Sequence, residues 1–289
     1  MVRAIETRHW CVELQRARGI HVTRLARLFC LIRTGNVDIA VLNKIAGTRR
    51  LYRRAVPKLG NWSVRRLNSL HRELPKVERY LEIGLSEGRT FENVSVPARV
   101  GVDPVPRFRL EALPPHVAVH VMTSDEFFAQ NEEAFDMVFL DGLHTYVQTY
   151  RDLVNALEVC PTGPILIDDV IPTDEVSAMP DMYESLAIRK EQGLSGFSWH
   201  GDVYRLAPCL RDHHPELEWR TILGSGNPQL LLWKKDPTAR VTALSAESLE
   251  GYASVSYDAV LGNGIPDYFR PSSEDQALAD CVDTIIGRA

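Results

Sequence analysis

The stretch RYLEIGLSEGRT, residues 79–90, decides the fold of this chain. Its apolar run ends at Glu82, and Gly84 and Gly88 follow with three residues between them. A helical pattern begins after the second glycine. This order predicts a buried strand that turns sharply into a helix, with glycines that let a ligand approach the backbone.

A second apolar run, residues 98–102, ends at Asp103. An acid at the tip of the second strand of such a unit is placed to accept hydrogen bonds from ribose hydroxyls. Dinucleotide folds usually carry G-x-G-x-x-G, which is missing here, and Glu82 would repel a pyrophosphate. A carboxylate at that position suits the ammonium of a methionine moiety instead.

These motifs resemble motif I of class I S-adenosylmethionine (SAM)-dependent methyltransferases, with Asp103 matching their second-strand acid. The resemblance implies SAM as the cofactor. The residues expected to bind it are Glu82, Gly84, Ser86, Gly88, Thr90, Asp103, Ser124, Asp125 and Asp141.

Composition indicates a soluble globular protein, since 45% of the 289 residues are apolar and 25% are charged. No apolar stretch reaches the length of a membrane span, and the arginine-rich start is unlike a signal peptide. The five cysteines are scattered and form no C-x-x-C motif. We therefore expect reduced thiols, no membrane partner and a cytoplasmic location.

Charge divides the chain unevenly. Residues 1–72 hold sixteen Lys and Arg against three Asp and Glu, whereas the whole chain has a net charge of −5. Apolar residues recur at helical spacing within this segment. We expect a basic helical extension that packs on an acidic catalytic domain, its own or that of a dimer mate, and so a homo-oligomer formed through these helices.

Strand and helix patterns alternate from residue 77 onward, which predicts an α/β fold of the Rossmann-like, doubly wound type. We expect a mostly parallel seven-stranded sheet with an N-terminal helical extension. The predicted domains are the extension 1–72, a core 73–240 with a substrate-covering insertion at 170–200, and a helical, peripheral segment 241–289. The expected later strands are 117–121, 135–141, 164–167 and a closing antiparallel pair, 218–223 and 229–233.

Acidic residues follow two neighbouring strands of this predicted sheet. Asp141 and His144 lie in the motif D-G-L-H-T-Y after the fourth strand, and Asp168 and Asp169 follow the fifth. Clustered acids repel one another unless a cation joins them, and oxygen ligands select Mg²⁺, or Ca²⁺ or Mn²⁺. We expect Asp141, Asp168 and Asp169 to bind the metal and His144 to act as the base. Both adjacent acids reach one ion only if the backbone leaves extended geometry there.

This constellation resembles metal-dependent O-methyltransferases that act on sugar hydroxyls of macrolides and other natural products. The resemblance covers residues 77–235, including the segment WHGDVY at 199–204. It implies methyl transfer from SAM to a hydroxyl of a small molecule. Chelation favours a vicinal diol as acceptor, and Met179, Met182, Tyr183 and Trp199 offer surface for a bulky ring, so we favour a glycosylated natural product.

Two alternatives stay open at this point. A nicotinamide-dependent oxidoreductase is disfavoured by Glu82 and by the missing third glycine. A nucleic-acid methyltransferase or binding protein is motivated by the basic extension, but the acidic remainder and the absence of an N-P-P-Y motif oppose it. We therefore disfavour nucleic acid as a partner.

Overall fold

The computed structural model describes residues 61–111, 113–194 and 199–288. The basic segment up to residue 60 lies outside these ranges, with Cys11 and Cys30, so the predicted extension and its role in a homo-oligomer stay predictions. Cys160, Cys209 and Cys281 are buried free thiols. Within the described ranges, no helix is both long and apolar enough to cross a membrane.

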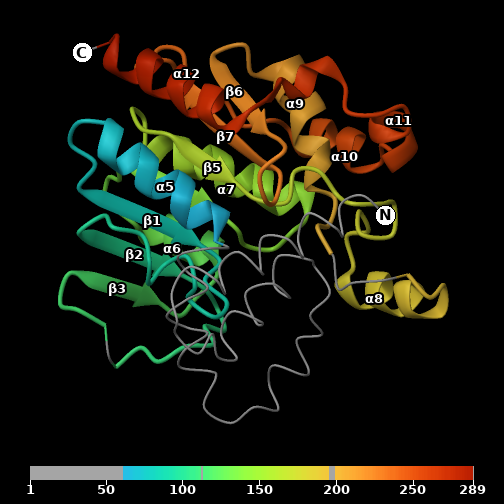
Figure 1. Ribbon diagram of the computed structural model, residues 1–289, viewed down its shortest axis with the longest axis horizontal. Helices are drawn as coiled ribbons and strands as arrows, with labels where there is room; N and C mark the ends of the chain where they lie inside the picture. Colours follow the sequence, from blue (N-terminus) through green and yellow to red (C-terminus); the bar gives the residue numbers. More distant parts are fainter. Residues whose placement is uncertain (1–60, 112, 195–198, 289) are drawn as a thin grey trace, which may run out of the picture. The chain divides into compact units, whose positions relative to one another are not determined.

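One eight-stranded sheet forms the centre of the fold, with the strand order β3-β2-β1-β4-β5-β7-β6-β8 (Figure 1). Strand β7 is antiparallel to β5 and β6, and the other neighbouring pairs are parallel. This confirms the predicted doubly wound α/β fold, to which the two-residue β8 adds an eighth strand. The strands are β1 (Arg79–Ile83), β2 (Ala98–Val102), β3 (Val117–His120), β4 (Met137–Leu140), β5 (Ile165–Ile167), β6 (Leu217–Ile222), β7 (Gln229–Lys234) and β8 (Pro271–Ser272).

Helices cover both faces of the sheet because both faces are apolar. Leu81 of β1 joins one buried cluster with α6, α7 and α9, whereas its neighbour Tyr80 joins a second with α5 and α12. Figure 1 shows α5 and α12 side by side and α8 standing clear of the sheet. The helices are α5 (Trp62–Glu73), α6 (Ser124–Gln130), α7 (Tyr146–Val159), α8 (Met182–Glu191), α9 (Leu206–His213), α10 (Ala246–Ala253), α11 (Tyr257–Leu261) and α12 (Glu274–Ile286).

The C-terminal segment is helical but not peripheral. Ala277 and Cys281 of α12 are fully buried against the sheet. Because α12 also packs on α5, the two ends of the described chain together close one face of the core.

The predicted helix after Gly88 is absent, and residues 84–97 form turns and loop instead. Val94 and Val96, both buried, have β-branched side chains that fit an extended chain better than a helix. Helix α5 fills the face that the predicted helix would have covered, through Leu67 and Leu70. The prediction of a strand followed by a helix was therefore wrong at this position, although the strand itself is correct.

Candidate active site

The register of β4 and β5 brings two acids together. Leu140 pairs with Ile167, so the next residues, Asp141 and Asp168, leave neighbouring strands at the same edge of the sheet. Asp169 has a φ of 58°, in the left-handed region, so the backbone turns out of extended geometry there. This is the condition under which the two adjacent acids can serve one site.

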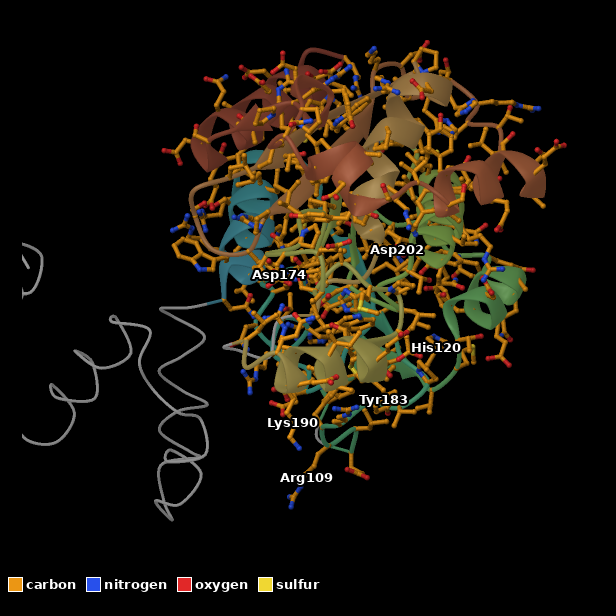
Figure 2. The ribbon with its side chains drawn as sticks, turned by 90° about the vertical axis from the view of Figure 1, so that its right-hand side faces the viewer. Arg109, His120, Asp174, Tyr183, Lys190 and Asp202 are labelled. Carbon is orange, nitrogen blue, oxygen red and sulfur yellow. The ribbon has the colours of Figure 1, made fainter. Side chains whose placement is uncertain are left out.

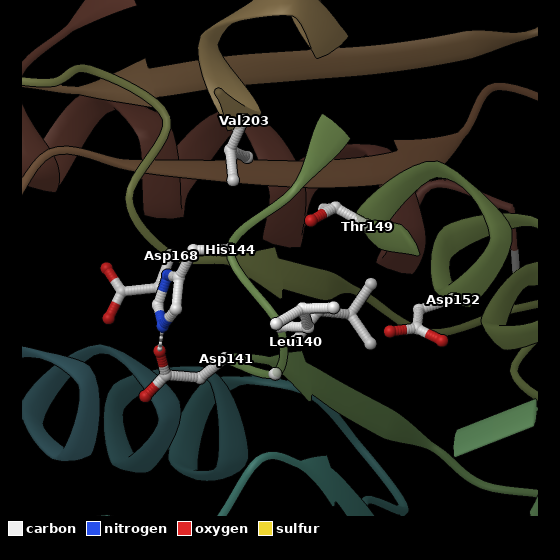
Figure 3. A pocket seen from close by; sticks show the side chains of 9 residues that line it. Leu140, Asp141, His144, Thr149, Asp152, Asp168 and Val203 are labelled. Atoms are coloured by element: carbon white, nitrogen blue, oxygen red, sulfur yellow. Dashed lines mark ion pairs between the residues drawn. The ribbon is translucent and has the colours of Figure 1, made fainter. Parts of the chain in front are cut away.

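His144 lies between these acids. Its Nδ1 is 2.7 Å from Asp169 Oδ2, and its Nε2 is 3.8 Å from Asp141 Oδ1. In Figure 3 the imidazole lies beside the carboxylates of Asp141 and Asp168. Ligand atoms of Asp141, His144 and Asp169 all lie within 4.8 Å of one another. The structure thus brings together the four side chains that the sequence predicted to meet.

The carboxylates of this cluster have strongly perturbed acidity. Burial and the charges of Asp168 and Asp169 raise the pKa of Asp141 well above its usual value. Burial and Asp169 raise the pKa of Asp168 to about 6. Burial also opposes ionisation of Asp169, but its hydrogen bond with His144 outweighs burial and lowers the pKa of Asp169. Burial disfavours the charged form of His144, yet the same hydrogen bond raises its pKa.

The segment 199–204 contacts the loop that carries His144 through hydrogen bonds and a ring contact. Asp202 donates its N–H to the carbonyl of His144 and accepts a hydrogen bond from the N–H of Tyr146, 2.5 Å away, at the start of α7. The ring of Trp199 meets the ring of His144 edge-on, with 5.1 Å between centroids. This part of the sequence resemblance therefore lies at the site.

Two further polar residues contact the cluster. Nδ2 of Asn227 donates to Asp168 Oδ1 over 2.5 Å and to Asp169 Oδ1 over 2.7 Å. Nε2 of His200 is 3.8 Å from Asp169 Oδ1. His200 lies in the segment 199–204 that the resemblance included, whereas no sequence pattern singled out Asn227. A GSGNP loop between two strands signals a turn, not a site.

The residues that follow β1 and β2 lie at the same edge of the sheet. We call them the β1–β2 corner, and the residues that follow β4 and β5 the β4–β5 corner. Asp103 Oδ2 accepts hydrogen bonds from the N–H groups of Leu85 and Ser86, both 2.8 Å away, and its Oδ1 accepts from Val105 over 2.7 Å. Ser86 has a φ of 46°. The acid predicted to hold a ribose thus binds the backbone of the glycine loop in this structure.

Both glycines of this loop are approached closely by the chain itself. A Cβ on Gly84, whose φ is +87°, would lie 1.9 Å from the carbonyl oxygen of Asp141. A Cβ on Gly88, whose φ is +71°, would lie 2.8 Å from the ring of Phe108. These close approaches require glycine at both positions, and the predicted contact of Gly84 and Gly88 with the cofactor stays a prediction.

Glu82 and Thr90, also predicted to bind SAM, point into the protein. Glu82 is 1% exposed, and its carboxylate accepts a hydrogen bond from the Tyr80 hydroxyl over 2.6 Å. Burial raises the pKa of Glu82 to about 8. The Thr90 hydroxyl accepts a hydrogen bond from Asn61, which caps the N-terminus of α5.

Ser124 and Asp125 begin α6, as predicted, next to the tip of β3. Thr123 and Glu126 form a capping box there. Nε2 of Gln148, on α7, lies 3.2 Å from both Ser124 Oγ and Asp125 Oδ1. These two residues stay predicted cofactor contacts, apart from the acidic cluster.

The chain matches one protein family. Residues 62–170 fit the family described as "Methyltransferase domain", a range that contains β1 to β5 and the corners described above. Residues 62–170 of this chain are thus similar to a methyltransferase domain. The match confirms the resemblance to class I SAM-dependent methyltransferases, and it favours methyl transfer over hydride transfer. A comparison with curated proteins gave no match.

The methyltransferase domain is similar to several solved structures. Cofactor-bound Rv0187 from MTB is 16% identical with a TM-score of 0.43, over 72% of this chain and 95% of that one. An O-methyltransferase from Bacillus cereus in complex with SAH is 16% identical with a TM-score of 0.35, over 78% and 98%. The MycE methyltransferase from the mycinamycin pathway, in complex with Mg and SAH, is 15% identical with a TM-score of 0.39, over 68% and 56%. At such low values the likeness carries no conclusion about substrates.

Proposed function

We propose that the methyltransferase domain transfers the methyl group of SAM to a hydroxyl group of a small molecule, with His144 as the base. The observation that carries this proposal is the pairing of His144 with Asp169. Because Asp169 accepts a hydrogen bond from Nδ1, the other ring nitrogen, Nε2, is left to accept a proton. A hydroxyl needs such a base, since it is a weak nucleophile while protonated.

The proposed roles balance protons and bonds. A proton of the acceptor hydroxyl passes to Nε2 of His144, the oxygen bonds to the methyl carbon, and the carbon–sulfur bond of the sulfonium breaks. SAM supplies the activated methyl group, and S-adenosylhomocysteine leaves. Asp169 fixes the imidazole orientation and stabilises its charged form. Trp199, edge-on to His144, limits access to the ring from one side.

The acidic cluster fits a divalent cation. Burial and the charges of Asp168 and Asp169 raise the pKa of Asp141 well above its usual value, so the ionised carboxylates repel one another. A divalent cation would offset that repulsion and take the carboxylate oxygens as ligands. Asp141, Asp168 and Asp169 would hold Mg²⁺, which would supply Lewis acidity to the acceptor hydroxyl.

We further propose a vicinal diol of a glycosylated natural product as the acceptor. Two adjacent hydroxyls can fill two positions at a cation together. The insertion offers apolar surface near the site, since Nε1 of Trp199 donates to the Met179 carbonyl over 2.7 Å, which ties the indole to this segment. Tyr183 is 79% exposed, and Figure 2 shows it on α8 toward the same end as His120 at the tip of β3.

An acceptor panel tests the proposal. Wild type and His144→Ala are supplied with labelled SAM and with matched diols, singly blocked diols and amines, and kcat/KM is measured for each. We expect diols to react best and His144→Ala to lose about 10²–10⁴-fold on hydroxyls. An amine attacks through its own lone pair, so its rate should depend far less on His144. Equal rates on amines and hydroxyls would contradict O-methylation.

The basic segment suggests a separate proposal. We propose that the basic segment up to residue 60 joins copies of the chain, because its positive charge complements the acidic remainder. Sedimentation of the full chain at low and high salt tests this. A salt-dependent mobility shift with RNA or DNA would instead favour the nucleic-acid alternative.

A further inference from the structure

We infer that Asn227 is a positioning residue of the candidate active site, which holds the carboxylates of Asp168 and Asp169 together, and that buried Arg66 holds Asn227 in turn. This inference rests on the proposed function, because it assigns Asn227 a role at the site proposed there. Arg66 lies on α5 and Asn227 lies on the loop before β7, so both are outside the strand tips that carry the acids.

Strand direction explains why a residue so distant in sequence reaches the acids. Because β7 is antiparallel to β5, its beginning lies at the edge where β5 ends. Ile167 pairs with Leu230, so the residues just before β7 come beside those just after β5. Asn227 therefore lies next to Asp168 and Asp169 as a consequence of the sheet register.

The Asn227 amide is suited to bridge two carboxylates. Carboxylates only accept hydrogen bonds when ionised, whereas the amide nitrogen carries two N–H donors. Nδ2 lies 2.5 Å from Asp168 Oδ1 and 2.7 Å from Asp169 Oδ1, so one planar group sets the distance between the two acids. Asn227 thus contacts two side chains of the cluster.

Arg66 fixes the loop that carries Asn227. This arginine of α5 is fully buried, and its Nη1 donates to the carbonyl of Asn227 over 2.9 Å and to Gln229 Oε1 over 2.5 Å. Its Nη2 donates to the carbonyl of Ser225, and its Nε to Glu274 Oε2 over 3.1 Å. A buried charge persists only when it is paired in this way, so the network resists displacement.

The contacts of Asn227 with the acids and of Arg66 with the Asn227 loop act on the same two carboxylates. Asp168 and Asp169 repel each other, and without the Asn227 amide Asp169 would keep its contact with His144 Nδ1 and Asp168 its contact with the Asp169 N–H, but no donor would join the two carboxylates. The Asn227 amide compensates part of this repulsion and keeps both oxygens directed to the place where a cation would sit. Loss of the bridge should therefore weaken cation binding even before SAM or acceptor is present.

Cation affinity of the full chain tests the inference. Mn²⁺ binding is measured by electron paramagnetic resonance, without SAM or acceptor, on wild type, Asn227→Ala and the control Asn263→Ala, an exposed asparagine in the turn after α11. We expect Asn227→Ala to bind Mn²⁺ about 10–100-fold more weakly and the control to equal wild type. Equal affinity of Asn227→Ala and wild type would overturn the inference.

Two more variants separate positioning from folding. Arg66→Lys keeps the charge beside Glu274 but loses the fork that reaches Asn227, so its Mn²⁺ affinity should fall by less than that of Asn227→Ala. Asn227→Asp replaces the donors with a third acid, so its melting temperature should fall in chelator and rise with Mn²⁺ by more than that of wild type. A melting temperature that is insensitive to Mn²⁺ in Asn227→Asp would contradict the positioning role.

The outcomes distinguish this inference from the proposed function. If wild type binds Mn²⁺ and Asn227→Ala binds it equally well, only the inference fails. If wild type binds no Mn²⁺ and methylates hydroxyls in chelator, the cation is removed from the proposed function and the inference falls with it. If wild type methylates no hydroxyl yet Asn227→Ala loses Mn²⁺ affinity, the proposed function fails and the inference stands.

Discussion

The acids at two pairs of strand tips, β4–β5 and β1–β2, differ in how fully protein partners satisfy their carboxylates. At the tips of β4 and β5, Asp141 and Asp168 keep raised pKa values, because His144 and the more distant Arg66 offset only part of the burial and the repulsion. At the tips of β1 and β2, each oxygen of Asp103 accepts backbone N–H groups, and Gly84 and Gly88 are covered by the chain itself.

The difference shows where a ligand is needed and where it must compete. The carboxylates at the β4–β5 corner are incompletely satisfied by protein partners. A cation or acceptor would therefore bind to groups that the fold has already brought together. The β1–β2 corner is largely satisfied internally, so SAM would share the Asp103 carboxylate with the three backbone N–H groups that it already accepts.

Asp169→Asn should have the largest effect, because it removes the carboxylate that orients His144. We expect kcat to fall by roughly 10²–10⁴-fold, since an amide neither fixes the tautomer nor stabilises the imidazolium. SAM affinity, measured by calorimetry, should stay near that of wild type. An unchanged kcat would show that the pairing of Asp169 with His144 has no catalytic role.

Gly84→Ala should damage both corners, because Gly84 touches the backbone of Asp141. The left-handed φ costs about 1–3 kcal/mol, and the overlap at 1.9 Å adds to it, so we expect a loss of roughly 3–5 kcal/mol in the free energy of unfolding. Gly264→Ala is the matched control, since Gly264 has a φ of +95° and no atom within 4 Å of the added Cβ. Equal losses in urea denaturation would mean that the contact with Asp141 adds nothing.

Asp103→Ala should weaken SAM by roughly 1.5–3 kcal/mol, the scale of hydrogen bonds to a charged group. The structure adds a second reason, since the variant also frees the N–H groups of Leu85 and Ser86. Asp103→Asn keeps one oxygen acceptor and should lose less. Calorimetry that finds wild-type SAM affinity in Asp103→Ala would remove Asp103 from the cofactor site.

Glu82→Gln should change how stability depends on pH. The pKa of Glu82 in the folded protein is about 8, above its ordinary value, so the native state keeps a proton that the unfolded chain loses. The contribution of Glu82 to stability is therefore fully present below the unfolded pKa. The free energy of unfolding then decreases as pH rises toward 8, by at most about 1.4 kcal/mol per pH unit. Urea denaturation from pH 5 to pH 8 should give a flatter profile in the variant. Identical profiles would contradict the raised pKa.

Sequence patterns located the strands because a buried strand consists of successive apolar residues. Runs that are apolar on successive residues predicted β1, β2, β4 and β5 within one or two residues, since a parallel strand buries both faces. Helix starts depend more on packing. Asn61 and Ser63 are both residue types that cap helices, but Asn61 accepts the N–H of Val64 at the start of α5, while Ser63 accepts a hydrogen bond from Gln229 inside the fold. Two polar residues this close compete for the cap, and packing decides between them.

Local sequence patterns were enough to predict the α/β alternation, the carboxyl edge as the place of the candidate site, and the acids and histidine that meet there. These depend on local apolar runs and on the rule that parallel strands end at one edge. Tertiary structure decided which partner each group has: His144 on Asp169, Asp103 on the glycine loop, and Asn227 across the acids. Such pairings join residues from separate strands and helices. They depend on register and strand direction, which no local pattern specifies.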